Sequence, residues 1–183
     1  MKNQYIVEHC SPTLAGLKTG SLFSVLGESK EKLNRDLRCL NKILRGKGLR
    51  AIPLRYTDNY VLIYLYRLEN LKKDLMRPET RSILREKGYD CSDPDMCVVQ
   101  LVKHIENDEV FPHEIGLFLG YPEKDVKGFM KSPEEGVLCV GYWKVYGDVE
   151  KAERTFRIFN RCTEVYCRAL KHGKSLEQLI VAA

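Results

Sequence analysis

The sequence lacks any long apolar run. No stretch approaches the roughly 20 consecutive apolar residues that a membrane-spanning helix needs, and the opening residues, MKNQYIVEH, lack the apolar core of a signal peptide. Low-complexity segments, blocks of like charge and evident internal repeats are absent as well. We therefore expect a cytoplasmic protein with no membrane partner.

Cysteine spacing excludes further classes. The seven cysteines are an odd number without a Cys-x-x-Cys pair, and 183 residues bury a sufficient core without disulfides. The sequence therefore predicts free thiols in a reducing compartment and no metal site. A hydrophobic fraction of 44% is typical of a folded globular protein, and a net charge of +5 permits an anionic partner without requiring one.

Apolar spacing locates the main elements. Leucines at positions 33, 37, 40 and 44 recur at helical intervals, which predicts a helix over residues 28–45. The alternating segments 49–56 and 60–67 flank a turn and predict an antiparallel hairpin, in which Pro53 restricts the first strand to an edge of the sheet. A third β-rich run, 137–146, is expected to join this hairpin.

The remaining segments have helical patterns. Three helical pieces over 68–108 are separated at Arg77-Pro78 and at 88–94, a long helix covers 148–172, and a short tail helix follows from Ser175. The sequence thus predicts one α+β domain over residues 1–183. Its small, mainly antiparallel sheet combines the hairpin 49–67 with the strand 137–146, surrounded by about seven helices.

Residues 9–23, HCSPTLAGLKTGSLF, carry a helix-start signal. Ser11 can cap a helix and Pro12 suits its first position. Cys10 would then lie just outside a helix N-terminus, where the helix dipole lowers the pKa of a thiol, and Lys18 would lie about two turns inside the helix. The alternative is an inert, buried Cys10 and a solvated Lys18.

The segment 111–130, FPHEIGLFLGYPEKDVKGFM, combines helix signals with ionisable groups. Pro112 suits a first helical turn, Gly120 can end that helix in a left-handed conformation, and Pro122 can open the next helix, which predicts two short helices around a tight corner. His113 and Glu114 then lie in the first turn. The helix dipole there favours the carboxylate and the neutral imidazole, the forms that act as ligands or bases.

Together, these two blocks resemble the family of bacterial proteins called domain of unknown function 3793. The resemblance covers most of the chain and implies a small soluble protein, without a mechanism or a functional residue.

The second block is also similar to a helix-turn-helix unit. The residues that match its pattern in order are Glu114, Ile115, Gly116, Leu119, Gly120 and Val126. The helix that would read DNA departs from the pattern, because it offers acidic and lysine side chains without the Arg, Asn or Gln that engage base edges.

Our first functional hypothesis is a small-molecule or cofactor site where the 9–20 and 111–130 segments meet. Both segments place ionisable or nucleophilic groups at helix starts, where backbone N–H groups can also hold an anion. The candidate ligand-binding residues are His9, Cys10, Lys18, His113 and Glu114. Among these, the inventory of thiol chemistry makes Cys10, His113 and Glu114 the candidates for catalysis.

Two alternatives remain open. The first is nucleic-acid binding through the corner at 113–131 and the basic face of the 28–45 helix, although such a face is often simply solvated. Its candidate residues are Arg35, Arg38, Lys42, Arg45, Lys124, Lys127 and Lys131. The second is a protein-interaction module without chemistry of its own, marked by an apolar surface patch without a pocket. The sequence identifies neither a cofactor nor an oligomeric state.

Overall fold

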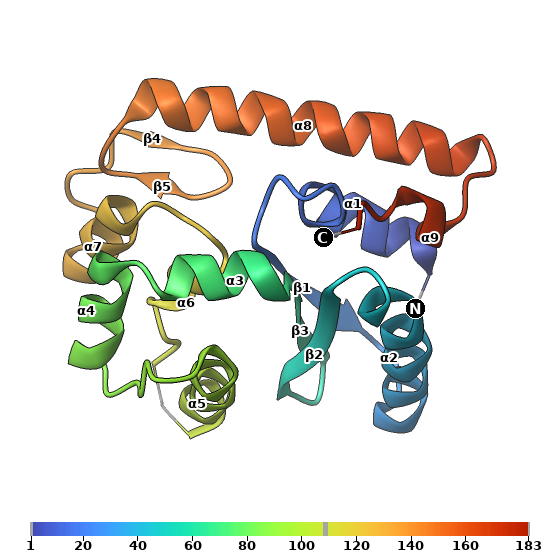
Figure 1. Cartoon of the computed structure of the whole chain (residues 1–183), viewed down its shortest axis with the longest axis horizontal. Coiled ribbons are helices and arrows are strands. Elements are labelled where there is room, and N and C mark those ends of the chain that lie inside the picture. Colours follow the sequence, from blue (N-terminus) through green and yellow to red (C-terminus); the bar gives the residue numbers. More distant parts are fainter. Residues whose placement is uncertain (1, 108–109, 183) are drawn as a thin grey trace. The chain divides into compact units, whose positions relative to one another are not determined.

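The computed structural model describes residues 2–107 and 110–182 (Figure 1). The chain divides into two compact units, Met1–Asn70 with Arg161–Ala183, and Leu71–Asn160, which we describe separately. The described residues form nine helices and two small antiparallel sheets, so the predicted α+β class is confirmed. That the whole chain is one domain stays a prediction.

The first unit contains a three-stranded antiparallel sheet with the strand order β1-β3-β2. The predicted hairpin is confirmed as β2 (Leu49–Tyr56) and β3 (Tyr60–Arg67). β2 lies at an edge, and its register shifts between Pro53 and Arg55, because proline has no N–H for the ladder. The third strand is β1 (Gly20–Leu26), which pairs with β3 along its whole length.

The expectation that residues 137–146 supply the third strand is wrong. They form β4 (Cys139–Val140) and β5 (Lys144–Val145), which pair as a separate two-stranded sheet in the second unit. Extended structure is interrupted at Gly141, which lies against the ring of Phe156. A Cβ at this position would approach that ring to 2.3 Å, so the chain bends here around an aromatic side chain.

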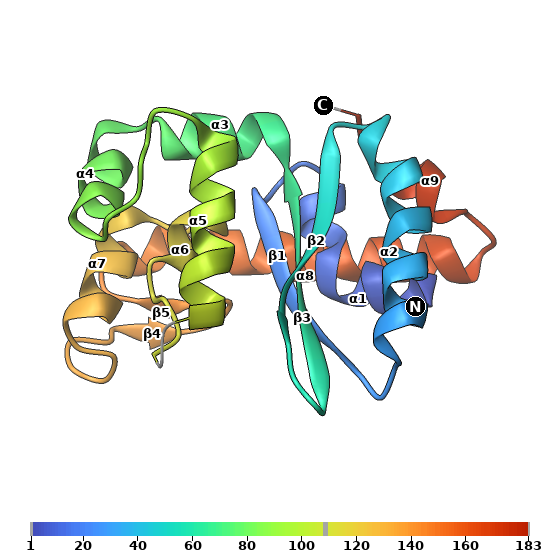
Figure 2. The ribbon, with the colours of Figure 1, turned by 90° about the horizontal axis from the view of Figure 1, so that it is seen from below.

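The core of the first unit combines the sheet with helices. α1 (Asn3–Leu14), α2 (Lys30–Arg45) and α9 (Leu176–Leu179) share one apolar core with the strands. Figure 2 shows α1 and α2 on the same side of the sheet. α2 confirms the helix predicted over 28–45, because the four leucines that predicted it are buried. α9 confirms the tail helix, which begins with a capping box at Ser175.

α1 begins earlier than predicted. It starts at Asn3 and includes Pro12 near its end, so Ser11 is not its N-cap; the Ser11 hydroxyl donates a hydrogen bond to Val7 O instead. Apolar residues at positions 6, 7, 10 and 14 are all buried and extend the helical spacing back from the predicted start. Cys10 therefore lies inside the helix, and Lys18 lies beyond its end.

Arg67 connects the end of α1 to the C-terminal segment. Arg67 is 2% exposed. Its guanidinium donates to Thr13 O and Leu14 O, each at 2.6 Å, and to Val181 O at 2.7 Å. The last carbonyls of a helix have no partner within the helix, so this side chain satisfies groups that α1 leaves open. Burial lowers the pKa of Arg67 below its usual value.

The second unit consists of helices and the β4-β5 sheet. The helices with residues in this unit are α3 (Leu68–Leu75), α4 (Pro78–Glu86), α5 (Pro94–Asn107), α6 (Ile115–Phe118), α7 (Glu123–Lys131) and α8 (Val149–Lys171). The breaks predicted at Arg77-Pro78 and at 88–94 and the long helix are confirmed. Residue 108, where the third helical piece was expected to end, lies outside the described residues.

Candidate functional site

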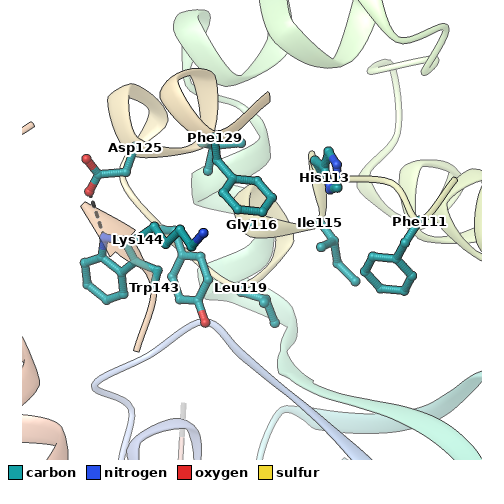
Figure 3. Close-up of a pocket in the computed structure, with 11 residues that line it drawn as sticks. Phe111, His113, Ile115, Gly116, Leu119, Asp125, Phe129, Trp143 and Lys144 are labelled. Atoms are coloured by element: carbon teal, nitrogen blue, oxygen red, sulfur yellow. Dashed lines mark hydrogen bonds between the residues drawn. The ribbon is translucent and has the colours of Figure 1, made fainter. Parts of the chain in front are cut away.

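A cavity of about 350 Å³ lies within the second unit, against α6, α7 and β5 (Figure 3). Every residue that lines it falls between positions 111 and 144. Its aliphatic and phenyl walls come from Phe111, Ile115, Leu119, Val126 and Phe129. A concave, mostly apolar cavity with a few polar groups is typical of sites for small molecules.

The corner between α6 and α7 has the predicted form. Gly120 has a φ of +78° and ends α6 with two backbone hydrogen bonds, from Gly120 N to Leu117 O at 3.1 Å and from Tyr121 N to Gly116 O at 2.9 Å. Gly116 also allows α7 to approach, because a Cβ there would lie 2.8 Å from Val126. Two glycines therefore determine how closely these walls of the cavity approach each other.

Asp125 fixes the β4-β5 hairpin against α7. Asp125 is 4% exposed. Its carboxylate accepts hydrogen bonds from Trp143 Nε1 at 2.7 Å and from the backbone N–H groups of Tyr146 and Gly147, each at 2.8 Å. A buried carboxylate with three donors is well satisfied. Asp125 thus positions the segment that brings Trp143 and Lys144 to the cavity.

Stacked aromatic rings form another wall. Tyr121 and Trp143 stack with their centroids 4.8 Å apart, and Trp143 meets Phe156 edge-on at 4.6 Å. The Tyr121 hydroxyl donates to Tyr142 O at 3.1 Å, and burial raises its pKa to about 12, so that it stays a neutral phenol. These contacts hold the two rings in place at the cavity.

Two further polar side chains reach the cavity, His113 and Lys144. The His113 ring meets Phe129 edge-on at 4.9 Å, and the Lys144 ammonium lies 5.8 Å from the centre of the same ring. Figure 3 shows Lys144 extending from the Trp143 side of the cavity toward Phe129, His113 on the other side, and the Asp125 carboxylate turned toward Trp143.

A second hollow of about 250 Å³ shares Phe111 and His113 with the first. It is lined by Glu114, a residue 5% exposed, whose Oε1 accepts a hydrogen bond from the Tyr89 hydroxyl at 2.9 Å and lies 3.8 Å from His104 Nδ1. Glu114 is the N-cap residue of α6, and His113 precedes it, so neither lies within the helix as predicted. His113 contacts both hollows, whereas Glu114 faces only the second.

The N-terminal candidates lie in the first unit. His9 is exposed on α1, with its ring 4.4 Å from that of Tyr5, and Cys10 is fully buried in the core. Burial raises the pKa of Cys10 to about 12 and lowers that of Lys18 to about 8, and the two groups interact electrostatically. Because Cys10 lies inside α1, the predicted activation by a helix N-terminus does not occur.

The chemistry of these groups gives no support to thiol catalysis. A thiol with a pKa of about 12 is protonated at neutral pH, and the thiolate is the nucleophile. His113 and Glu114 belong to the second unit, so a site shared with the 9–20 segment stays a prediction. Among the residues that the structure describes, no three His, Cys, Asp or Glu side chains are arranged to hold a metal ion.

The nucleic-acid candidates are exposed but divided between the units. Arg35, Arg38, Lys42 and Arg45 are exposed on α2 in the first unit, and Lys124, Lys127 and Lys131 are exposed on α7 in the second. On α7, Glu123 accepts hydrogen bonds from Arg77 Nη1 at 3.3 Å and Thr80 Oγ1 at 3.2 Å, while Asp125 is buried. The acidic groups that α7 shows in sequence are therefore engaged internally. Binding of nucleic acid stays a prediction.

Sequence reasoning missed Trp143, Lys144 and the internal role of Asp125. The first two fall in the run 137–146 that was assigned to the main sheet. A signal for Asp125 exists, because it lies four positions before Phe129 and hence on the inward face of α7.

The fold and the cavity define a small α+β protein with one aromatic-lined apolar cavity beside a glycine corner. The chain belongs to the family described as Protein of unknown function (DUF3793), which matches residues 6–180. No curated protein and no solved structure matches the chain. In the part of the chain described by the structure, no helix has the length and apolar character needed to cross a membrane.

Proposed function

We propose that this protein binds a small, largely apolar molecule that contains a ring, in the cavity between α6, α7 and β5. The observation that carries this proposal is the cavity itself, about 350 Å³ in volume and lined by four aromatic side chains from the segment 111–144. Volumes of roughly 300–1,000 Å³ are usual for small-molecule sites. At about 30 Å³ for each water-sized group, the cavity accommodates a ligand of at least about a dozen non-hydrogen atoms.

The arrangement of polar groups supports a small molecule over a protein partner. An interaction module without chemistry would present an apolar patch without a pocket. Here the apolar groups instead surround a hollow, and its polar side chains, His113, Asp125 and Lys144, are few. A few fixed polar groups in an apolar cavity orient a ligand, whereas the apolar walls supply the free energy of burial.

Calorimetric titration of the full chain with indole and with cinnamate tests the proposal. Both probes are planar and of the right size, one neutral and one anionic. We expect saturable binding of at least one of them with one site for each chain. Because Trp143 is the only tryptophan, a change in its fluorescence with indole analogues that do not absorb at its excitation wavelength provides a second readout.

Variants that fill the cavity show where the probe binds. Ile115→Phe and Leu119→Phe enlarge two residues of the wall that are 6% and 5% exposed. A phenyl group at either position occupies space that the probe needs, so we expect affinity to fall by about tenfold or more, about 1.4 kcal/mol of binding free energy. Ile158→Phe and Leu138→Phe are matched controls in the same unit, at residues 52% and 59% exposed, and should bind as the natural chain does.

The proposal fails if neither probe binds, or if the filled and control variants bind equally while circular dichroism shows that all are folded. Steep loss of duplex or single-stranded DNA binding with salt, measured in parallel, would instead favour the nucleic-acid alternative.

A further inference from the structure

We infer that the natural occupant of the cavity is an aromatic acid, whose carboxylate is held by Lys144. This inference rests on the proposed function and adds the chemical class of the ligand. It follows from which polar groups at the cavity already have partners, and from where the remaining donors lie.

The Asp125 carboxylate, the Trp143 indole N–H and the Tyr121 hydroxyl all form hydrogen bonds within the protein. Both oxygens of Asp125 accept hydrogen bonds, Oδ2 from Trp143 Nε1 and Oδ1 from two backbone N–H groups. The Tyr121 hydroxyl donates to a backbone carbonyl at 3.1 Å. A ligand cation would therefore have to compete with three donors for the Asp125 carboxylate.

Lys144 retains capacity for an anion. Its ammonium donates to Pro133 O at 2.9 Å and to Glu134 Oε1 at 2.7 Å, which leaves one of its three N–H groups for another acceptor. The Glu134 side chain is 84% exposed, and ion pairs with such groups contribute little, about 0–1 kcal/mol. A ligand carboxylate can therefore accept the remaining N–H group or replace Glu134.

Lys144 lies beside the aromatic wall of the cavity. Its ammonium is 5.8 Å from the centre of the Phe129 ring, whereas the His113 ring meets the Phe129 ring at 4.9 Å from the other side of the cavity (Figure 3). A planar ligand that packs against the aromatic rings can therefore place its acid group at the Lys144 ammonium. The ring of the ligand gains from aromatic packing, and its acid group gains a charge-assisted hydrogen bond.

Three probes with the same carbon skeleton test the inference: cinnamate, cinnamamide and cinnamylamine. We expect calorimetry to show cinnamate binding about tenfold or more tightly than the amide, because hydrogen bonds to a charged group exceed neutral ones by that amount, and the amine binding most weakly. If cinnamamide binds as tightly as cinnamate, or the amine binds best, the inference is overturned while the proposed function stands. If none of the three binds, and indole does not bind either, both are overturned.

Substitutions separate charge recognition from structure. Lys144→Gln should lower cinnamate affinity by about fivefold to tenfold and leave cinnamamide affinity within about twofold. Lys127→Gln, which removes an exposed lysine of α7 that does not line the cavity, is the control for overall charge. Glu134→Gln should strengthen cinnamate binding by about twofold to fivefold, because it removes the competing carboxylate, and Glu135→Gln should not. Equal losses for cinnamate and cinnamamide in Lys144→Gln would contradict the role assigned to Lys144.

Discussion

Asp125→Asn tests how the cavity is held together. The asparagine amide keeps one oxygen that can accept from the N–H groups of Tyr146 and Gly147, as Oδ1 does now at 2.8 Å. Its NH₂ group, however, would face Trp143 Nε1, which now donates to Oδ2 at 2.7 Å. Two donors then meet, and a partly buried indole N–H loses its acceptor.

The expected cost is about 2 kcal/mol, since a hydrogen bond to a charged group contributes about 1.5–3 kcal/mol. Urea unfolding followed by the fluorescence of Trp143, the only tryptophan, reports on this unit directly. At a typical slope, the midpoint should fall by about 1 M urea.

Asp148→Asn is the matched control. Asp148 is exposed and accepts from Lys151 N at 3.0 Å before α8, a role that asparagine fills about equally well, so its midpoint should change little. An Asp125→Asn loss below about 0.5 kcal/mol, within the range of ordinary surface substitutions, would refute the role of Asp125 as the clamp of the hairpin.

Two further predictions concern the first unit. Arg67→Met removes the guanidinium that donates to Thr13 O, Leu14 O and Val181 O, although Thr13 O and Leu14 O keep backbone donors. The substitution should lower the free energy of unfolding by about 2–4 kcal/mol and speed carboxypeptidase digestion; unchanged digestion would contradict the anchoring of the C-terminal segment by Arg67. Burial lowers the pKa of Lys18 from 10.5 to about 8. Between these pH values the unfolded chain holds a proton on Lys18 that the folded chain has released, so the free energy of unfolding should rise as the pH increases from 8 to 9. Above pH 9 the raised pKa of Cys10 acts in the opposite direction. Lys18→Met should abolish that rise and increase the free energy of unfolding at neutral pH by up to about 3 kcal/mol, since one pKa unit corresponds to 1.36 kcal/mol. Urea unfolding at each pH measures this effect, and a rise that persists in the variant would refute the role of Lys18.

Elements with strong local signals were predictable from the sequence. α2 combines leucines at helical spacing with a capping serine, and the hairpin 49–67 combines alternation with a turn. The corner at Gly120 was also predictable, because few residues other than glycine take a φ of +78°.

Elements that depend on distant contacts were not predictable. Residues 20–26 received no strand prediction, because they follow the Ser11-Pro12 helix-start signal, whereas pairing with β3 makes them a strand. Ser11-Pro12 in turn lies at the end of α1, because burial of Ile6, Val7, Cys10 and Leu14 extends the helix backward. Tertiary packing thus outweighed a local capping signal.

The cavity was half predictable. The segment 111–130 was identified through its proline and glycine helix signals and its ionisable groups, and His113 does line the cavity. Trp143 and Lys144 come from a hairpin whose position depends on three hydrogen bonds to one buried carboxylate, a contact that no periodicity indicates.

Titration of the protein with cinnamate, followed by amide and indole N–H signals in two-dimensional NMR spectra, shows whether the cavity between α6, α7 and β5 binds the ligand. We expect the Trp143 indole signal and the amides of residues 111–130 and 139–147 to shift together along one saturable curve. Shifts confined to α1, α2 or the sheet of the first unit, or no saturable shift at all, would contradict binding in this cavity.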